Sequence, residues 1–291
     1  MSGSGAVSWV HEIEGFRIAD GLDETGLQAI RDTLLRHSVV VLRDQHLTPR
    51  DQLEFTDRLA PVERNPARPA GGSHAPIVEG VPEIVVISNI VEDGRPIGLS
   101  DAGVMWHTDM QGQARPELFG TLSAVTIPVR DGVALGDTRF TRTAMAYEAL
   151  DDAMKARLAG LRGIQSYAYY IDALHKRGAL TRPPMTQAQR DAVVEASHPI
   201  VRTHPITGRK LLYVSESYTD RIEGMDADEG RALIDSLSAH LVEEVFQVVH
   251  RWREGDLLIW DNCATQHLAT FDYGTMPRRL HRCGTTGPVP E

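Results

Sequence analysis

Apolar residues near the start of the chain recur at helical spacing and then give way to a continuous run. Leu27, Ile30, Leu34 and Leu35 lie at helical spacing and predict an amphipathic helix over residues 23–37, with Asp23 as its N-cap. The apolar, β-branched run 38–42 predicts a buried strand. Thr48 and Pro49 have the cap and first-turn character that begins another helix. The chain therefore opens with helices and strands mixed.

The middle of the chain alternates between short strand-like and helical segments. We expect strands over 10–18, 82–90, 104–109 and 118–129, helices over 143–160, 186–196 and 226–242, and a hairpin around 205–209. Residues 61–81 are rich in Pro and Gly and predict a surface loop. Residues 162–185 are aromatic and without clear period, which fits either a lid over a pocket or an ordinary surface loop.

Strand-like segments return in the last part of the chain, over residues 245–252, 256–261 and 279–286. Each is short and bounded by Gly, Pro or Asn, as in an antiparallel barrel or sandwich. With 291 residues and 42% hydrophobic content, the chain predicts one domain over 1–291 of the α+β class.

The composition of the chain argues against several classes of function. A formal net charge of −10 and the absence of basic runs argue against a nucleic-acid partner. No apolar run approaches the roughly 20 residues of a membrane span, and the first residues do not resemble a signal peptide, so we expect a cytoplasmic protein with no membrane contact. The two cysteines form no CxxC pair and should be reduced. A symmetric homo-oligomer is a reasonable expectation for such a chain.

One His-x-acid triplet suggests a metal site. His107 and Asp109 would project from the same face of an extended segment and could grip one ion. About 1.6 such triplets are expected by chance in this composition, so the triplet alone is weak. His267, just after an apolar strand, could complete the two-imidazole, one-carboxylate arrangement that leaves iron positions open. Taken alone, His267 fits a capped loop histidine better.

A pair of arginines strengthens the case. On a strand, Arg278 and Arg282 share a face, so two guanidinium groups could look into one pocket. Such a pair suits a dianion, and 2-oxoglutarate has a distal carboxylate that matches a bidentate guanidinium. The alternative is a solvated basic edge strand that protects against aggregation.

Four motifs in order resemble the taurine dioxygenase family, which includes dichlorophenoxyacetate dioxygenase. They are WHTD at 106–109, GDT at 136–138, IWDNCATQH at 259–267 and RRLHR at 278–282. The resemblance implies a double-stranded β-helix, or jelly-roll, core with flanking helices. It also implies Fe(II), 2-oxoglutarate as co-substrate and O₂, used to hydroxylate or otherwise oxidise a C–H bond of a small substrate with release of succinate and CO₂.

The resemblance also implies roles for individual residues. His107, Asp109 and His267 would be the iron ligands, while Arg278 and Thr138 would hold the distal carboxylate of 2-oxoglutarate.

Other residues are expected to line the pocket. Arg282 would contact an acid group of the substrate or help to orient the co-substrate, which favours an anionic small molecule. Trp260 would be a pocket wall, or equally a core tryptophan, and Asn89 and Met110 are further candidates for substrate binding.

Two other functions remain compatible with parts of the pattern. A non-redox, zinc-type hydrolase could use the same His, Asp and His ligands with an activated water, although it would leave the paired arginines unexplained. A catalytically silent ligand-binding barrel would keep the fold without turnover.

Overall fold

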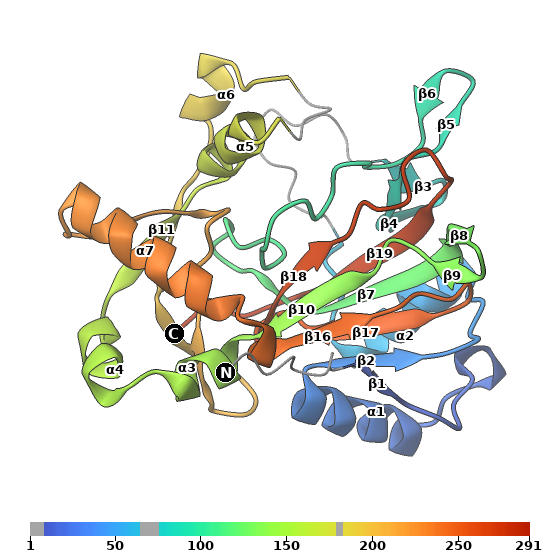
Figure 1. Cartoon of the computed structure of the whole chain (residues 1–291). Helices are drawn as coiled ribbons and strands as arrows, with labels where there is room; N and C mark the ends of the chain where they lie inside the picture. Colours follow the sequence, from blue (N-terminus) through green and yellow to red (C-terminus); the bar gives the residue numbers. More distant parts are fainter. Residues whose placement is uncertain (1–8, 65–75, 179–182) are drawn as a thin grey trace.

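Two sheets pack around one apolar core in the computed structural model, which describes residues 9–64, 76–178 and 183–291 (Figure 1). The larger sheet has the strand order β1-β2-β17-β7-β19-β4-β3, and the smaller has the order β16-β10-β18. Every neighbouring pair in them is antiparallel except β1 with β2. The strands are β1 His11–Glu12, β2 Val39–Leu42, β3 Ile77–Val78, β4 Val81–Ser88, β7 Glu117–Thr126, β10 Thr138–Arg142, β16 Gln247–His250, β17 Leu257–Asp261, β18 Thr265–Ala269 and β19 Arg279–Thr286.

The continuous apolar run in β2 is explained by burial on both faces. Val39 and Val41 belong to the core between the two sheets, together with Trp260 of β17. Val40 and Leu42 point the other way, into a second cluster with residues of α1 (Glu24–His37) and α2 (Pro49–Leu59). A strand that buries both faces needs apolar residues at every position.

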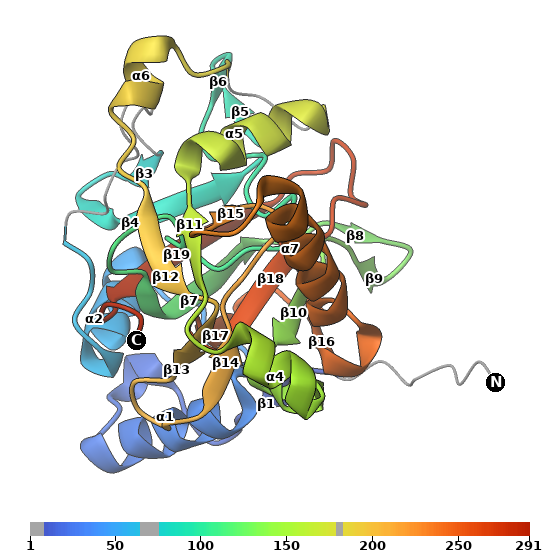
Figure 2. The ribbon, with the colours of Figure 1, turned by 90° about the vertical axis from the view of Figure 1, so that its left-hand side faces the viewer.

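Helices α1 and α2 begin where their sequence predicted. The carboxylate of Asp23 accepts a hydrogen bond from the Gly26 amide at 2.8 Å, and Thr48 forms a capping box with Asp51. Figures 1 and 2 both place α1 outside the large sheet, with its apolar side against β2 and β17. The two predicted helices and the intervening strand are therefore confirmed.

A further layer is built from the chain between β10 and β16. Its longest helix, α7 (Ala227–Leu241), packs on an apolar cluster that includes Leu212, Val214 and Ile222. The other elements of this stretch are α3 Thr143–Ala149, α4 Asp152–Leu158, β11 Arg162–Gln165, α5 Tyr167–Lys176, α6 Gln187–Asp191, β12 Ala196–Pro199, β13 Val201–Thr203, β14 Lys210–Leu212, β15 Thr219–Ile222 and the 3₁₀ helix η2 Glu244–Phe246. Small elements elsewhere are η1 Ile18–Asp20, β5 Val91–Glu92, β6 Arg95–Pro96, β8 Val129–Arg130 and β9 Val133–Ala134.

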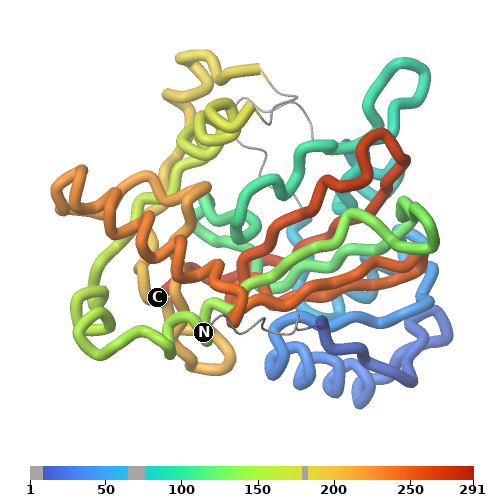
Figure 3. Tube along the Cα trace, in the orientation of Figure 1, coloured from blue at the N-terminus to red at the C-terminus, as the bar shows by residue number. Residues whose placement is uncertain are grey.

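Strands from the middle of the sequence alternate in space with strands from its end. β7 lies between β17 and β19, and β10 lies between β16 and β18, so green and orange-to-red segments interleave in Figure 3. This interleaving is the jelly-roll arrangement, and the predicted α+β fold with flanking helices is confirmed. It places β18 and the chain after β17 next to segments that precede them by more than a hundred residues.

Several predicted boundaries are wrong. The single helix expected over 143–160 is two, because Leu150 is extended (ψ 147°) and Asp151 caps a new helix. The stretch 162–185, expected to be irregular, contains β11 and α5, and the helix expected over 186–196 covers only Gln187–Asp191. The first strand, expected over 10–18, is limited to His11–Glu12.

The expected strand at 104–109 reduces to a single bridging residue, His107. The end of the loop expected over 61–81 is wrong, since β3 begins at Ile77 and β4 at Val81. Residues 65–75 of that loop lie outside the described part of the chain, as do residues 179–182 of the suggested lid. Among the helices that the structure describes, no segment combines the length and apolar character needed to span a bilayer.

A buried, hydrogen-bonded histidine–aspartate pair supports the turn between β17 and β18. His204 Nε2 donates to Asp261 Oδ2 at 2.8 Å, and both side chains are almost fully buried. The amides of Ile206 and Thr207 donate to His204 Nδ1, which places the ring hydrogen on Nε2. The other oxygen of Asp261 accepts from the amides of Cys263 and Ala264 at 3.0 and 3.2 Å.

Replacement of Asp261 by alanine should therefore lower the free energy of unfolding by about 3 kcal/mol, because three buried donors lose their acceptor. Urea denaturation followed by circular dichroism measures the change. Asp228→Ala, at an exposed position on α7, is the matched control and should cost less than about 0.5 kcal/mol. Equal losses in the two variants would show that the pair does not support the turn.

Candidate metal centre

Three side chains that are distant in sequence converge at one end of the core. One potential ligand atom from each of His107, Asp109 and His267 lies within 4.8 Å of the others. His107 Nε2 is 3.5 Å from Asp109 Oδ1, and His267 Nε2 is 3.6 Å from Asp109 Oδ2. Two imidazole nitrogens and a carboxylate facing a common point form a donor set suited to Fe(II).

The backbone holds the two histidines together. The His267 amide donates to the His107 carbonyl at 2.9 Å, and the His107 amide donates back to His267 at 3.3 Å. Thr108 Oγ1 adds a bond to the carbonyl of Thr265 at 3.0 Å. His267 lies on β18, opposite Phe140 of β10. A bridge of one residue thus pairs His107 with His267, where the sequence predicted a longer strand over 104–109.

Asp109 is positioned by Asn262, a residue that sequence reasoning did not single out. The Asp109 amide donates to Asn262 Oδ1, and Asn262 Nδ2 donates to the Asp109 carbonyl, both at 3.0 Å. Asn262 Nδ2 also bonds the carbonyl of Glu117, so one amide ties the metal-side loop to the start of β7. The only sequence signal was an asparagine directly after an apolar strand, which is equally typical of a turn.

Protonation states favour metal binding. His107 Nδ1 lies 2.8 Å from the Met105 carbonyl, so Nδ1 carries the hydrogen and Nε2 keeps its lone pair. Burial and the neighbouring His107 lower the pKa of His267 to about 3, so this ring is neutral. Burial alone would raise the pKa of Asp109, but Arg282 and the two histidines outweigh it and hold the pKa well below its ordinary value. His267 and Asp109 therefore present the unprotonated donors that a metal requires.

Arg278 is buried without a carboxylate partner, and it is bonded to the loop before β10, whose Thr138 pairs with Ala269, two residues after His267. It is 4% exposed, and its Nη2 donates to the Gly136 carbonyl at 3.0 Å. Its Nε has no hydrogen-bond partner, and no carboxylate within the described residues forms an ion pair with it. Burial lowers the pKa of Arg278, although Tyr273, Asp272 and Asp137 oppose the shift. An unpaired buried guanidinium is costly unless an anion meets it, so this site fits the distal carboxylate of 2-oxoglutarate.

Thr138 and Trp260 are both buried and lie on β10 and β17. The Thr138 hydroxyl accepts a hydrogen bond from Trp252 Nε1 at 3.1 Å, which leaves its own hydrogen free to donate. Trp260 is 2% exposed, and its ring lies 5.4 Å from the His267 ring. A Cβ on Gly120 would meet the Trp260 ring at 2.1 Å, so glycine is required behind it. Trp260 therefore supports the His267 imidazole from within the core.

Arg282 lies between two carboxylates. Its Nη2 is 2.9 Å from Asp109 Oδ2 and also bonds Glu117 Oε2. Burial raises the pKa of Glu117 to about 7, although Arg282 opposes the rise. The predicted common face with Arg278 holds, since Arg279 and His281 contact each other on the opposite face. Sequence reasoning gave no hint of Glu117.

The two remaining pocket candidates differ in their surroundings. Asn89 Oδ1 accepts from the Arg278 amide, and Asn89 Nδ2 donates to the Met276 carbonyl, both at 2.9 Å. It therefore holds the backbone that carries Arg278. Met110 follows Asp109 in a left-handed turn (φ 57°) and is partly exposed.

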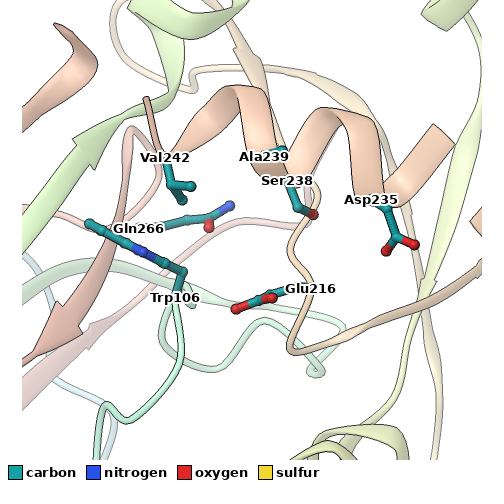
Figure 4. A pocket seen from close by; sticks show the side chains of 7 residues that line it. All are labelled: Trp106, Glu216, Asp235, Ser238, Ala239, Val242 and Gln266. Atoms are coloured by element: carbon teal, nitrogen blue, oxygen red, sulfur yellow. The ribbon is translucent and has the colours of Figure 1, made fainter. Parts of the chain in front are cut away.

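A hollow of about 270 Å³ lies behind the metal ligands (Figure 4). It contains the sequence neighbours of the two histidines, Trp106 and Gln266, which face Val242 after α7. Side chains alternate along extended chain, so these neighbours point away from the cluster. The hollow contains none of the three ligands and is separate from the site.

Comparison with known proteins agrees with this geometry. Residues 4–284 match the family model described as taurine catabolism dioxygenase TauD, TfdA family. The chain belongs to this family. It is 32% identical over 277 residues to pentalenolactone F synthase of Streptomyces arenae, covering 93% of this chain and 89% of the relative. It is 31% identical over 285 residues to the α-ketoglutarate-dependent 2,4-dichlorophenoxyacetate dioxygenase of Cupriavidus pinatubonensis, covering 94% and 93%.

Solved structures show the same relationship for the fold. A taurine dioxygenase from Burkholderia xenovorans superposes with a TM-score of 0.75 at 32% identity, covering 98% of this chain and 92% of the other. AAD-2 in complex with Mn(II) and N-oxalylglycine gives 0.79 at 26% identity, covering 98% and 99%. The predictions of the TauD, TfdA family, of a dioxygenase and of Fe(II), 2-oxoglutarate and O₂ as its cofactor and co-substrates are confirmed.

Because Asn262 fixes the backbone of a predicted metal ligand of this TauD-type enzyme, Asn262→Ala should weaken metal binding by about 10–100-fold. Anaerobic equilibrium dialysis against Fe(II) measures this loss. Gln247→Ala serves as the control, since Gln247 is also a buried amide bonded to a backbone carbonyl, that of Val242, but lies outside the cluster. Unchanged Fe(II) affinity in folded Asn262→Ala would exclude the positioning role.

Proposed function

We propose that this protein oxidises a small organic acid in a reaction that depends on Fe(II) and 2-oxoglutarate, with hydroxylation as the default outcome. The observations that carry the proposal are the converging donors of His107, Asp109 and His267 and the buried guanidinium of Arg278, which forms no salt bridge within the described residues. The cluster alone would also suit a zinc-type hydrolase. The unpaired guanidinium favours the dioxygenase, because a hydrolase would have no use for a buried carboxylate receptor.

Each residue has a part in holding the reactants. His107, Asp109 and His267 would hold the metal, and Arg278 with the Thr138 hydroxyl would bind the distal carboxylate of 2-oxoglutarate. When bound, the metal with 2-oxoglutarate and O₂ supplies the oxidising power that breaks the substrate C–H bond, and succinate and CO₂ are the co-products. The side chains orient that bond and keep water out of the buried site.

Arg282 supports an acidic substrate. Its Nε and Nη2 face Asp109 and Glu117, which leaves the N–H groups of Nη1 for an acid group. Relatives in the same family are named for sulfate ester and dichlorophenoxyacetate substrates, which also contain acid groups. Met110, on the turn after Asp109, is placed to line the approach. We further infer a cytoplasmic location and a homo-oligomer, and no nucleic-acid partner.

The proposal is tested by adding Fe(II) and 2-oxoglutarate to the protein under argon. A weak visible absorption band should appear, since both ligands would bind at one centre, and Asp109→Ala and His267→Ala should each abolish the band. Asp235→Ala, at an exposed acid on α7, is the control and should retain it. No band in the wild type, or a full band in both ligand variants, would contradict the proposal and favour the hydrolase or a silent barrel.

Arg278→Ala should raise the KM for 2-oxoglutarate by about 10–100-fold, because a charge-assisted hydrogen-bond pair contributes roughly 1.5–3 kcal/mol. Fe(II) affinity should change little. Succinate release as a function of 2-oxoglutarate concentration gives the comparison, with Arg279→Ala on the opposite face of β19 as the control. An unchanged KM would remove Arg278 from this role.

A further inference from the structure

The charge of Arg282 is already neutralised inside the protein. Its guanidinium contacts Asp109 on one side and Glu117 on the other, and the side chains of the three residues are 17%, 14% and 6% exposed. A guanidinium that served only to attract an anion would not need a second carboxylate. Glu117 does not ligate the metal in our assignment, so its burial calls for a separate explanation.

The fold makes room for this carboxylate. Glu117 is the first residue of β7, and β7 pairs with β19, where the register is irregular between Gly284 and Thr286. A Cβ placed on Gly284 would lie 2.1 Å from Glu117 Oε2 and 2.4 Å from Oε1. Gly284 does not have a positive φ, so the glycine is required by the neighbouring carboxylate rather than by the backbone conformation. The position of Glu117 against Arg282 is therefore built into two strands.

We propose that Glu117 is a specificity-determining residue that makes the site select zwitterionic substrates, such as α-amino acids, over simple organic acids. The inference rests on the proposed function and narrows its substrate class. It follows from the balance of charge in a buried site, where an unpaired charge is costly.

The balance can be stated residue by residue. Above the pKa of about 7 of Glu117, Asp109 and Glu117 both carry negative charge, and Arg278 and Arg282 carry equal positive charge, so the four side chains cancel. A divalent metal and the 2-oxoglutarate dianion also cancel. A simple carboxylate added beside Arg282 would leave one excess negative charge, whereas a zwitterion would leave none. The substrate's acid group would use Nη1 of Arg282, and its ammonium group would lie in the negative field of Glu117.

Pairs of probes that differ only in an α-ammonium group test this inference: hexanoate against norleucine, and phenylacetate against phenylglycine. Dissociation constants are measured by calorimetry on the metal-free protein, and under argon on the protein loaded with Fe(II) and 2-oxoglutarate. The wild type should bind each amino acid more tightly than its simple acid. Glu117→Gln should shift that preference toward the simple acid by about tenfold or more, because one of the two carboxylates that balance the charge of Arg282 is removed.

Gly284→Ala provides an independent variant, because its methyl group would displace the Glu117 carboxylate without removing its charge from the protein. It should shift the preference in the same direction. Glu229→Gln is the matched control, since it makes the same substitution at an exposed glutamate on α7 that pairs with Arg157, and it should shift nothing.

The outcomes separate the two proposals. If the wild type forms the 2-oxoglutarate absorption band but prefers the simple acids, or if both variants keep the wild-type preference while forming the band, the role of Glu117 is refuted and the proposed function stands. If the wild type forms no band, the proposed function fails and this inference fails with it.

Discussion

Two reciprocal backbone hydrogen bonds between His107 and His267 are the constraint on which the site depends. They join a loop before β7 to a strand near the end of the chain, and they bring both imidazoles to one point without any side-chain contact being needed. Asn262 then fixes the third donor by clamping the backbone of Asp109. Because backbone groups set these positions, the fold itself holds the donors in place.

More of the site's chemistry than of the structure around it could be predicted from the sequence. His107 and Asp109 form a local pattern, and the apolar strand before His267 can be recognised in the sequence, so the three metal ligands could be predicted. Asn262, Glu117 and Gly284 were not, because their roles arise from contacts between segments far apart in the chain, which no local sequence pattern indicates. The helix α5 was missed for another reason: its tyrosines have modest helix propensity, and packing against Met105 stabilises it.

Two arginines four residues apart, one just before β19 and one within it, differ in role because their surroundings differ. Arg278 is buried without an ion pair among the described residues, and it is prepared for a ligand's carboxylate. Arg282 is buried between two carboxylates, and its charge is satisfied within the protein. The residue type is the same, and a sequence pattern treats them alike. The neighbouring segments make the difference: the loop before β10 offers Arg278 only a carbonyl, whereas β7 provides a carboxylate to Arg282.

The contacts beside the metal ligands join segments far apart in the chain, so the site can form only late in synthesis. Thr108 and Thr265, whose hydrogen bond flanks the histidine pair, are 157 residues apart. A nascent polypeptide that has left the ribosome only as far as β16 possesses two of the three donors and lacks the strand that aligns them. Iron would therefore be taken up after translation is nearly finished, when the closed core can already shield a redox-active ion from the cell.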